Sequence, residues 1–278
     1  MTSQAQRASA FKLLHEQPHA FIMPNPWDAG SACLLASIGF EALATTSAGL
    51  AFSLAKPDGS ATREETLANI RVIAAATDLP LSADLENGFG DAPEICAETI
   101  RLGAEAGPVG GSIEDATGRP EDPIYPLDVA CARIKAAARA AHALPSPFML
   151  TARAENHLHG RNDLADTIKR LQAYAEAGAD VLFAPGLHNA DDICAIVQAV
   201  APKPVNVVMG LTGSSLSLAA LSALGVRRIS VGGALARAAF GELIRAAEEM
   251  KNTGTFTFAD RAAPFATLDG LFRNRRES

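Results

Sequence analysis

The sequence has little of what defines several large classes of protein. Its 278 residues include four cysteines, at positions 33, 96, 131 and 194. They show no CxxC spacing and have no histidine nearby in the sequence that would complete a zinc site. We therefore interpret them as buried thiols that take no part in the chemistry.

Long apolar runs and excess basic charge are also absent. The N-terminal segment lacks the apolar core of a secretory signal, and no run approaches the ~20 apolar residues that cross a bilayer. We expect a cytoplasmic protein with no membrane partner. Lysine and arginine number 24 against 31 acidic residues, for a net charge of −7. Because nucleic-acid phosphates require clustered basic residues, we expect no nucleic-acid partner, and a small-molecule ligand fits better.

The sequence does contain eight short apolar runs that end in small or polar residues. They cover residues 20–25, 41–47, 79–84, 109–115, 147–153, 180–185, 203–209 and 227–233. Apolar residues at three- and four-residue spacing indicate helices at 62–76, 93–106, 127–143, 161–177, 190–200, 214–224 and 234–252. This alternation, without a long linker, predicts one α/β domain over residues 1–278, a (β/α)8 TIM barrel with residues 254–278 as a C-terminal helical extension.

Acidic residues follow the third and fourth predicted strands. Asp84 and Glu86 close the stretch "LSADLENGFG" and share one face of the strand, because side chains alternate along it. Glu114 and Asp115 follow the fourth strand, and Arg153 ends the fifth. In such barrels the reactive groups lie at the C-terminal ends of the strands, so we expect these side chains to meet at one mouth.

Closely packed carboxylates repel one another, so a divalent cation is a natural partner for this group. An all-oxygen set favours Mg²⁺ or Mn²⁺, held partly through water. The alternative is a charge cluster at the barrel rim that pairs with Arg153 and Lys56 and has no metal.

Five segments together resemble the isocitrate lyase/phosphoenolpyruvate mutase superfamily. They are "NPWDAGSA", "TTSAGLA", "SADLENGFG", "GGSIEDATG" and "TARAEN". They occur in the family's order, at matching strand ends, and the likeness covers about residues 8–250. The resemblance implies a Mg²⁺-dependent enzyme that makes or breaks C–C or P–C bonds of small anionic 2-oxo or 2-hydroxy acids through an enolate.

The resemblance also implies roles for individual residues. Asp84 would ligate the metal directly, and Glu86 and Glu114 would act mainly through metal-bound water. Family members usually have aspartate where Glu86 stands. The implied substrate contacts are Ser47, Ala48, Gly49, Asp84, Arg153 and Asn206.

The implied catalytic residues are Arg153, Glu114 and Asp58. Arg153 corresponds to the arginine that holds the substrate oxygen. Asp58 lies in the counterpart of the family's gating loop, where an aspartate of the mutases contacts the transferred group. The Pro-Asp-Gly tripeptide at this position is equally typical of a simple turn.

The sequence departs from the family at several positions. The lyases carry a Lys/Arg-Cys-Gly-His loop after the fourth strand, where this chain reads "EDATGRPEDPIYP". Pro185 and Gly186 replace a glutamate or histidine, and Thr45 replaces the mutase tryptophan. We therefore expect C–C cleavage or decarboxylation of a small 2-oxo or 2-hydroxy acid, with solvent, Tyr125 or His157 as proton donor. The alternative is phosphonopyruvate hydrolase or phosphoenolpyruvate mutase chemistry.

Two rival interpretations stay open. The loops "GLTGSS" and "SVGGAL" after the last two strands are typical of phosphate recognition in barrels. A non-catalytic 2-oxo acid binding protein is the other possibility. Finally, apolar residues between positions 256 and 272 predict that the tail packs on something, and the resemblance implies a homodimer or homotetramer formed by exchange of the last barrel helix.

Overall fold

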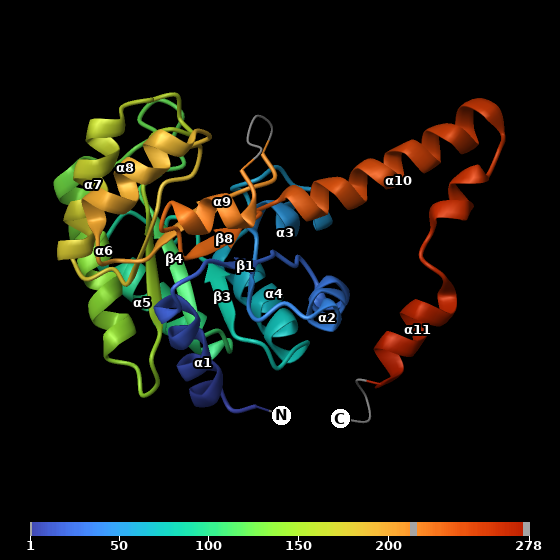
Figure 1. Ribbon diagram of the computed structural model, residues 1–278, viewed down its shortest axis with the longest axis horizontal. Helices are drawn as coiled ribbons and strands as arrows, with labels where there is room; N and C mark the ends of the chain where they lie inside the picture. Colours follow the sequence, from blue (N-terminus) through green and yellow to red (C-terminus); the bar gives the residue numbers. More distant parts are fainter. Residues whose placement is uncertain (1, 212–215, 275–278) are drawn as a thin grey trace.

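The protein is a nearly closed barrel of eight parallel strands, seen in a computed structural model that describes residues 2–211 and 216–274 (Figure 1). The strand order is β1-β8-β7-β6-β5-β4-β3-β2, so β1 and β2 are the two ends of the sheet. The backbone N–H of Ala44 donates to the carbonyl oxygen of Pro24 at 3.1 Å and joins these ends. The predicted (β/α)8 barrel is confirmed.

Each of the eight predicted runs contains one strand. The strands are β1 (Phe21–Met23), β2 (Leu43–Ala44), β3 (Leu81–Asp84), β4 (Gly110–Glu114), β5 (Met149–Arg153), β6 (Val181–Phe183), β7 (Val205–Val208) and β8 (Arg228–Ser230). Their regular parallel pairing brings all eight C-terminal ends to one face of the barrel.

The helices surround this barrel. They are α1 (Gln4–Glu16), α2 (Ala29–Ile38), α3 (Ser47–Ser53), α4 (Arg63–Ala75), α5 (Pro93–Glu105), α6 (Leu127–His142), α7 (Leu164–Glu176), α8 (Ala190–Val200), α9 (Leu218–Ala223), α10 (Ala234–Thr253), the 3₁₀ helix η1 (Thr257–Arg261) and α11 (Phe265–Asn274). Helices α4 to α10 confirm the seven predicted ranges, although positions 214 and 215 lie outside the described residues. The predicted capping box at the start of α4 is present, since Thr62 and Glu65 exchange side-chain to backbone hydrogen bonds of 3.2 and 2.8 Å.

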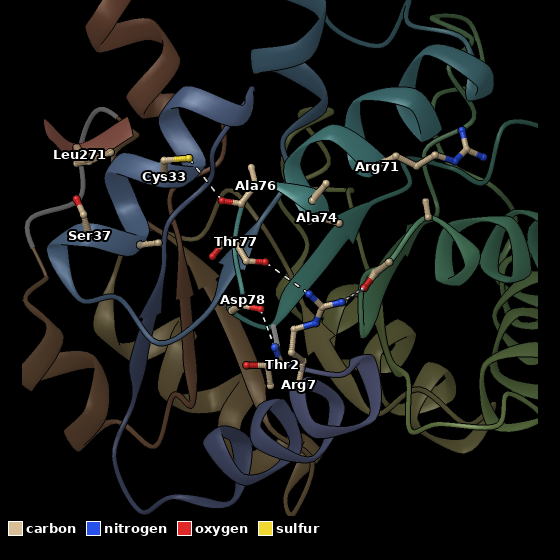
Figure 2. A pocket seen from close by; sticks show the side chains of 14 residues that line it. Thr2, Arg7, Cys33, Ser37, Arg71, Ala74, Ala76, Thr77, Asp78 and Leu271 are labelled. Carbon is tan, nitrogen blue, oxygen red and sulfur yellow. Dashed lines mark hydrogen bonds between the residues drawn. The ribbon is translucent and has the colours of Figure 1, made fainter. Parts of the chain in front are cut away.

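The face with the N-terminal strand ends carries a cavity of about 590 Å³ (Figure 2). Its polar groups are largely engaged in tying the chain together. The guanidinium of Arg7 donates to the carbonyl oxygens of Thr77 and Gly107, and the N–H of Thr2 donates to Asp78. In barrels of this class that end of the strands serves stability, and catalysis occurs at the other end.

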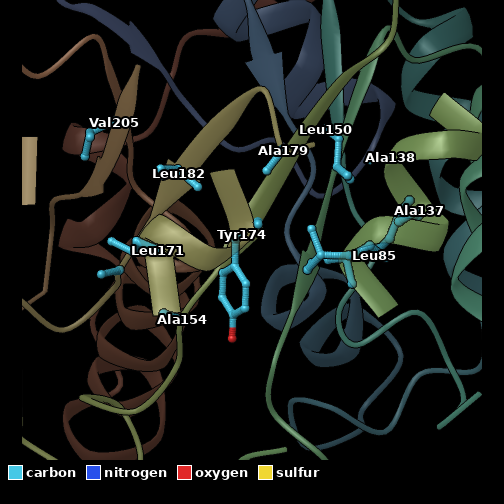
Figure 3. Packing of buried hydrophobic residues seen from close by; sticks show 14 of the residues in the cluster. Leu85, Ala137, Ala138, Leu150, Ala154, Leu171, Tyr174, Ala179, Leu182 and Val205 are labelled. Carbon is cyan, nitrogen blue, oxygen red and sulfur yellow. The ribbon is translucent and has the colours of Figure 1, made fainter. Parts of the chain in front are cut away.

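The core lies mainly between the sheet and helices α5 to α8. Figure 3 shows Leu150 and Leu182 from the sheet beside Leu171 and Tyr174 from α7. All four are fully buried, and the Tyr174 hydroxyl donates to the Asp115 carboxylate. This packing holds the strand ends rigidly, which is what a positioned site requires.

The C-terminal extension leaves the barrel. Helix α10 leads away from it, and η1 and α11 follow on that side (Figure 1). Helix α11 touches α2, and Leu271 packs at the edge of the small cluster beneath that helix. The prediction that the tail packs on something is thus met by α2, but Phe256 and Phe265 remain 66% and 89% exposed. No helix within the described residues is long and apolar enough to cross a membrane.

The core makes one prediction about stability. Leu182→Ala removes a fully buried side chain between β6 and its covering helices, and we expect the free energy of unfolding to fall by about 2–5 kcal/mol. Leu13→Ala, on the exposed side of α1, is the matched control, and we expect its free energy of unfolding to change by no more than about 0.5 kcal/mol. Urea denaturation measures both. Equal losses for the two variants would contradict the core described above.

Candidate active site

A cavity of about 220 Å³ lies at the C-terminal ends of the strands, and every strand or the loop after it contributes to its wall. Of the residues predicted for the site, those that line it are Ser47, Ala48, Asp58, Asp84, Arg153 and Asn206. Gly49, Glu86 and Glu114 are not part of the lining. Its size suits a small organic acid, and its location agrees with the rule for this fold.

Arg153, at the end of β5, joins the carboxylates of neighbouring strands. Its Nη1 lies 3.0 Å from Asp84 Oδ1 and 3.1 Å from Glu114 Oε2. On its other edge, Nε donates to Glu155 Oε1 at 2.9 Å. Burial alone lowers the pKa of Arg153, but the charges of these acids raise it well above the ordinary value. The guanidinium therefore remains charged and fixed in direction at the cavity wall.

Asp84 is also held from the side of β2. The backbone N–H of Ser47 donates to Asp84 Oδ2 at 3.0 Å, and the Asp84 N–H donates to Thr45 Oγ1 at 2.8 Å. Ser112 contributes a longer bond of 3.5 Å to Oδ1. The contacts of Thr45 and Ser112 with Asp84 are not predicted from the sequence, because threonine and serine on barrel strands are too common to signal a site.

The start of α3 explains the "TTSAG" stretch. Thr46 caps the helix, since its hydroxyl accepts from the Gly49 N–H at 3.3 Å. A Cβ on Gly49 would stand 2.7 Å from Trp27 Cβ, so only glycine fits there. The Ser47 and Gly49 N–H groups thus have partners within the chain, while Ser47 and Ala48 face the cavity. The carboxylate contact predicted for residues 47–49 stays a prediction.

The carboxyl groups of Glu86 and Glu114 have raised pKa values in this structure, so they keep their protons to higher pH than ordinary glutamates. Burial, followed by the charges of Asp84 and Asp58, raises the pKa of Glu86 to about 8. Burial also raises the pKa of Glu114 well above its ordinary value, although Arg153 opposes the shift. Glu86 Oε1 is buried and has no hydrogen-bond partner within residues 2–211 and 216–274. The backbone at Glu86 has a φ of 48°, the left-handed region that side chains other than glycine seldom adopt.

Asp58 belongs to an exposed loop, yet its side chain reaches the cavity wall. Partial desolvation, and then the charge of Asp84, raises the pKa of Asp58, while a hydrogen bond with the Ser47 side chain lowers it. Asp58 also caps its own turn by accepting from the Gly59 N–H at 3.0 Å. The position of Asp58 is therefore compatible with both interpretations of the Pro-Asp-Gly tripeptide, as part of a gating loop and as a simple turn. Lys56, in the same loop, pairs with Glu65 and is not part of the acidic cluster.

Asp115 does not join the cavity, contrary to the sequence-based expectation. It follows Glu114 directly, so it points to the opposite side of the strand. There it accepts from the Glu155 N–H at 2.8 Å, from Arg170 at 3.1 Å and from Tyr174. Asp115 thereby supports Glu155, which holds Arg153. The predicted proton donors Tyr125 and His157 do not line the cavity either, and the Tyr125 hydroxyl donates to Asp91.

The donor chemistry at the mouth fits a hard divalent cation. The acids offer only oxygen, and one buried oxygen of Glu86 has no hydrogen-bond partner among the residues that the structure describes. Burial, and after it the charges of neighbouring acids, raise the pKa of Glu86 and Glu114, and a cation would offset both effects. Within residues 2–211 and 216–274, however, no three Asp, Glu, His or Cys side chains already form a metal-binding group. The residues therefore fit a cation that takes much of its coordination from water or from a bound acid.

The fold and the site together place the protein in the class of (β/α)8 barrels that carry a cluster of acids and an arginine at the C-terminal ends of the strands. Comparisons with known proteins agree with this class. The phosphoenolpyruvate phosphomutase family model matches residues 11–251. A Burkholderia cenocepacia J2315 protein, provisionally assigned as a lyase or mutase, is 63% identical with a TM-score of 0.95, over 97% of this chain and 96% of that one. The probable 2-methylisocitrate lyase 1 of Corynebacterium glutamicum is 30% identical over 90% of this chain and 83% of its own.

A structure of oxaloacetate acetylhydrolase with the product oxalate is 25% identical, with a TM-score of 0.87, over 98% of this chain and 95% of that one. The chain belongs to the phosphoenolpyruvate phosphomutase family, within the isocitrate lyase/phosphoenolpyruvate mutase superfamily.

The raised pKa of Glu86 makes a prediction about pH. Its folded-state pKa of about 8 exceeds the unfolded value near 4.5, so between these pH values the folded state binds the extra proton and stability falls as pH rises. Thermal unfolding in a chelator should show wild type losing stability relative to Glu86→Gln from pH 5 to pH 8. Glu16→Gln, an exposed carboxylate, is the control and should follow wild type. If the melting temperatures of Glu86→Gln and wild type change in parallel with pH, the raised pKa of Glu86 is refuted.

Proposed function

We propose that the protein is a Mg²⁺-dependent lyase, with Mn²⁺ as a substitute, that cleaves a C–C bond of a small 2-oxo or 2-hydroxy acid through an enolate. The observation that carries this proposal is the Arg153 guanidinium, fixed between Asp84, Glu114 and Glu155 at the wall of a cavity sized for such an acid. The relatives support the substrate class by name, because oxaloacetate is a 2-oxo acid and 2-methylisocitrate a 2-hydroxy acid.

Arg153 stabilises the reaction's developing charge. In a 2-oxo acid, breaking the C3–C4 bond makes C3 carbanionic and negative charge grows on the oxygen at C2, and a fixed guanidinium beside that oxygen lowers the barrier without having to reorient. Glu155 sets the plane of the guanidinium, and the Ser47 N–H sets the direction of Asp84. A bound Mg²⁺ would supply a second positive charge at the same oxygen, held by Asp84 directly and by Glu86 and Glu114 through water.

Asp58 supplies the proton in this proposal. It reaches the cavity from an exposed loop, and its raised pKa lets the carboxyl keep a proton at higher pH than an ordinary aspartate. Its side chain has a hydrogen bond with Ser47, and Asp58 and Arg153 line the same cavity. A proton held there can pass to the carbanionic carbon once the bond has broken.

The second candidate is P–C bond chemistry, which the name of the matching family model favours. It requires the cavity to accept a phosphonate beside the 2-oxo group. The rival phosphate site after β7 lies partly outside the described residues, at positions 212–215. Turnover of phosphonopyruvate, or competition by inorganic phosphate, would favour these alternatives, whereas tight oxalate binding without phosphate competition would favour C–C chemistry.

The decisive activity test uses C3 to C6 2-oxo and 2-hydroxy acids with Mg²⁺ or Mn²⁺. We expect turnover that a chelator abolishes and that falls about a hundredfold or more in Asp84→Ala and Arg153→Ala, because each removes a group at the reacting oxygen. Arg119→Ala is the control, since Arg119 pairs with exposed Asp91 and does not line the cavity. Circular dichroism confirms folding of each variant.

Full activity in either site variant would remove the role assigned to that residue. Binding of these acids without any turnover would instead support a non-catalytic 2-oxo acid binding protein.

We also propose that the protein is a homodimer or homotetramer built by exchange of α10 and the extension after it. Leu243 and Ile244 on α10 are 61% and 56% exposed, and Phe265 follows on α11. Exposed apolar side chains on a helix that leaves its own barrel favour burial against a second copy (Figure 1).

Light scattering should therefore report two or four chains per particle for the wild type. The double variant Leu243→Glu and Ile244→Glu should reduce this number toward one. Leu13→Glu, on the exposed face of α1, is the control and should keep the wild-type size. A wild-type monomer would contradict the proposed exchange.

A further inference from the structure

The floor of the cavity contains a buried arginine without an acidic partner. Arg228, the first residue of β8, is 2% exposed and belongs to the cavity lining. Its nitrogens meet only neutral acceptors: Asn206 Oδ1 at 2.9 Å, Thr151 Oγ1 at 2.8 Å and His15 Nε2 at 3.4 Å. No carboxylate of residues 2–211 or 216–274 forms an ion pair with it. A buried guanidinium is costly without a counter-charge, so its retention requires a reason.

His15 does not share or cancel this charge. Its Nδ1 lies 2.8 Å from the carbonyl oxygen of Phe11, which can only accept, so Nδ1 carries the proton and Nε2 accepts from Arg228. Burial and the nearby Arg228 lower the pKa of His15 to about 3, which keeps the imidazole neutral. Burial lowers the pKa of Arg228 to about 9, so near neutral pH the floor holds one positive charge.

Arg228 also decides how Asn206 faces the cavity. Because a guanidinium has only donors, the atom of Asn206 that meets Arg228 must be the carbonyl oxygen. The amide nitrogen is then directed to Ser230 Oγ at 3.0 Å, and Ser230 lines the cavity with it. The amide group of Asn206 has two hydrogens and uses one of them for Ser230, so it has a second N–H to donate at this end of the cavity, with a positive charge behind it. That is the arrangement that binds an anionic oxygen.

The cationic floor and the acidic mouth lie on opposite sides of the barrel. In the strand order, β7 with Asn206 is four strands from β3 with Asp84, which is the opposite side of an eight-stranded ring. A substrate whose 2-oxo group lies beside Asp84 and Arg153 can extend its remote end across the cavity toward Asn206 and Arg228.

We propose that Arg228 is a positioning residue that orients Asn206 and selects substrates with a second anionic group, so that the enzyme prefers diacids to monoacids. This inference rests on the proposed function, because it assigns the substrate's reacting end to Arg153. It adds the residue and the charge that distinguish one class of 2-oxo acid from another. The simpler alternative is that Arg228 only ties α1 to the barrel through His15.

The test compares equilibrium binding of pyruvate, a monoacid, with binding of oxaloacetate and 2-oxoglutarate, both diacids, in the presence of Mg²⁺. Asn206→Asp is the central variant: its carboxylate can pair with Arg228, which preserves the fold while it cancels the charge and removes the donor. We expect diacid affinity to fall about tenfold or more, pyruvate affinity to stay within about twofold, and the melting temperature not to fall.

Three further variants separate a role of Arg228 in substrate selection from a purely structural role. Arg228→Gln should lose the same diacid preference, and Arg228→Lys, which keeps the charge, should restore part of it. His15→Gln keeps an acceptor toward Arg228 and should leave the ratio of diacid to monoacid affinity at the wild-type value, even where it lowers the melting temperature.

The outcomes separate the two proposals. If wild type binds pyruvate as tightly as the diacids, or if Asn206→Asp and Arg228→Gln keep the wild-type ratio, the role of Arg228 is refuted and the proposed function stands. An equal loss of preference in His15→Gln would also refute it, in favour of a structural tie. If wild type binds none of these acids, the proposed function fails and the inference fails with it.

Discussion

The site depends on one interaction, the guanidinium of Arg153 held by carboxylates at the ends of β3 and β4 and in the loop after β5. Asp84 and Glu114 approach one nitrogen, and Glu155 fixes the other edge. Three carboxylates, those of Asp84, Glu114 and Glu155, share this single guanidinium, so the group holds more acid than one arginine balances. The imbalance is what makes the mouth suited to a cation, and the rigid barrel beneath it keeps the repelling groups together.

Positive and negative charge are separated across the cavity. The acids stand on β3 and β4, and an unbalanced Arg228 lies under Asn206 on the side of β7 and β8. A ligand that carries an oxygen pair at one end and an anionic group at the other would meet a partner at both ends. The overall charge of −7 opposes anions at long range, so the local charges must dominate within the cavity.

Much of this arrangement could be predicted from the sequence, because it follows from strand periodicity. Asp84 and Arg153 end apolar runs, and parallel strands bring such ends to one face. The same rule applied residue by residue would have placed Asp115 away from the cavity, since it is adjacent to Glu114. Arg228 could not be identified in this way. Its role depends on the register that sets it beside Asn206, and on the helix α1 that brings His15 from 213 positions away.

The most direct measurement is a crystal structure of the protein with Mg²⁺ and oxalate. We expect the metal ion beside Asp84, with Glu86 and Glu114 reached through water, and an oxalate oxygen within hydrogen-bond distance of Arg153. An unoccupied mouth under saturating Mg²⁺ and oxalate, with Arg153 still paired only to its carboxylates, would contradict the central claim that these acids hold a cation that binds the substrate oxygen.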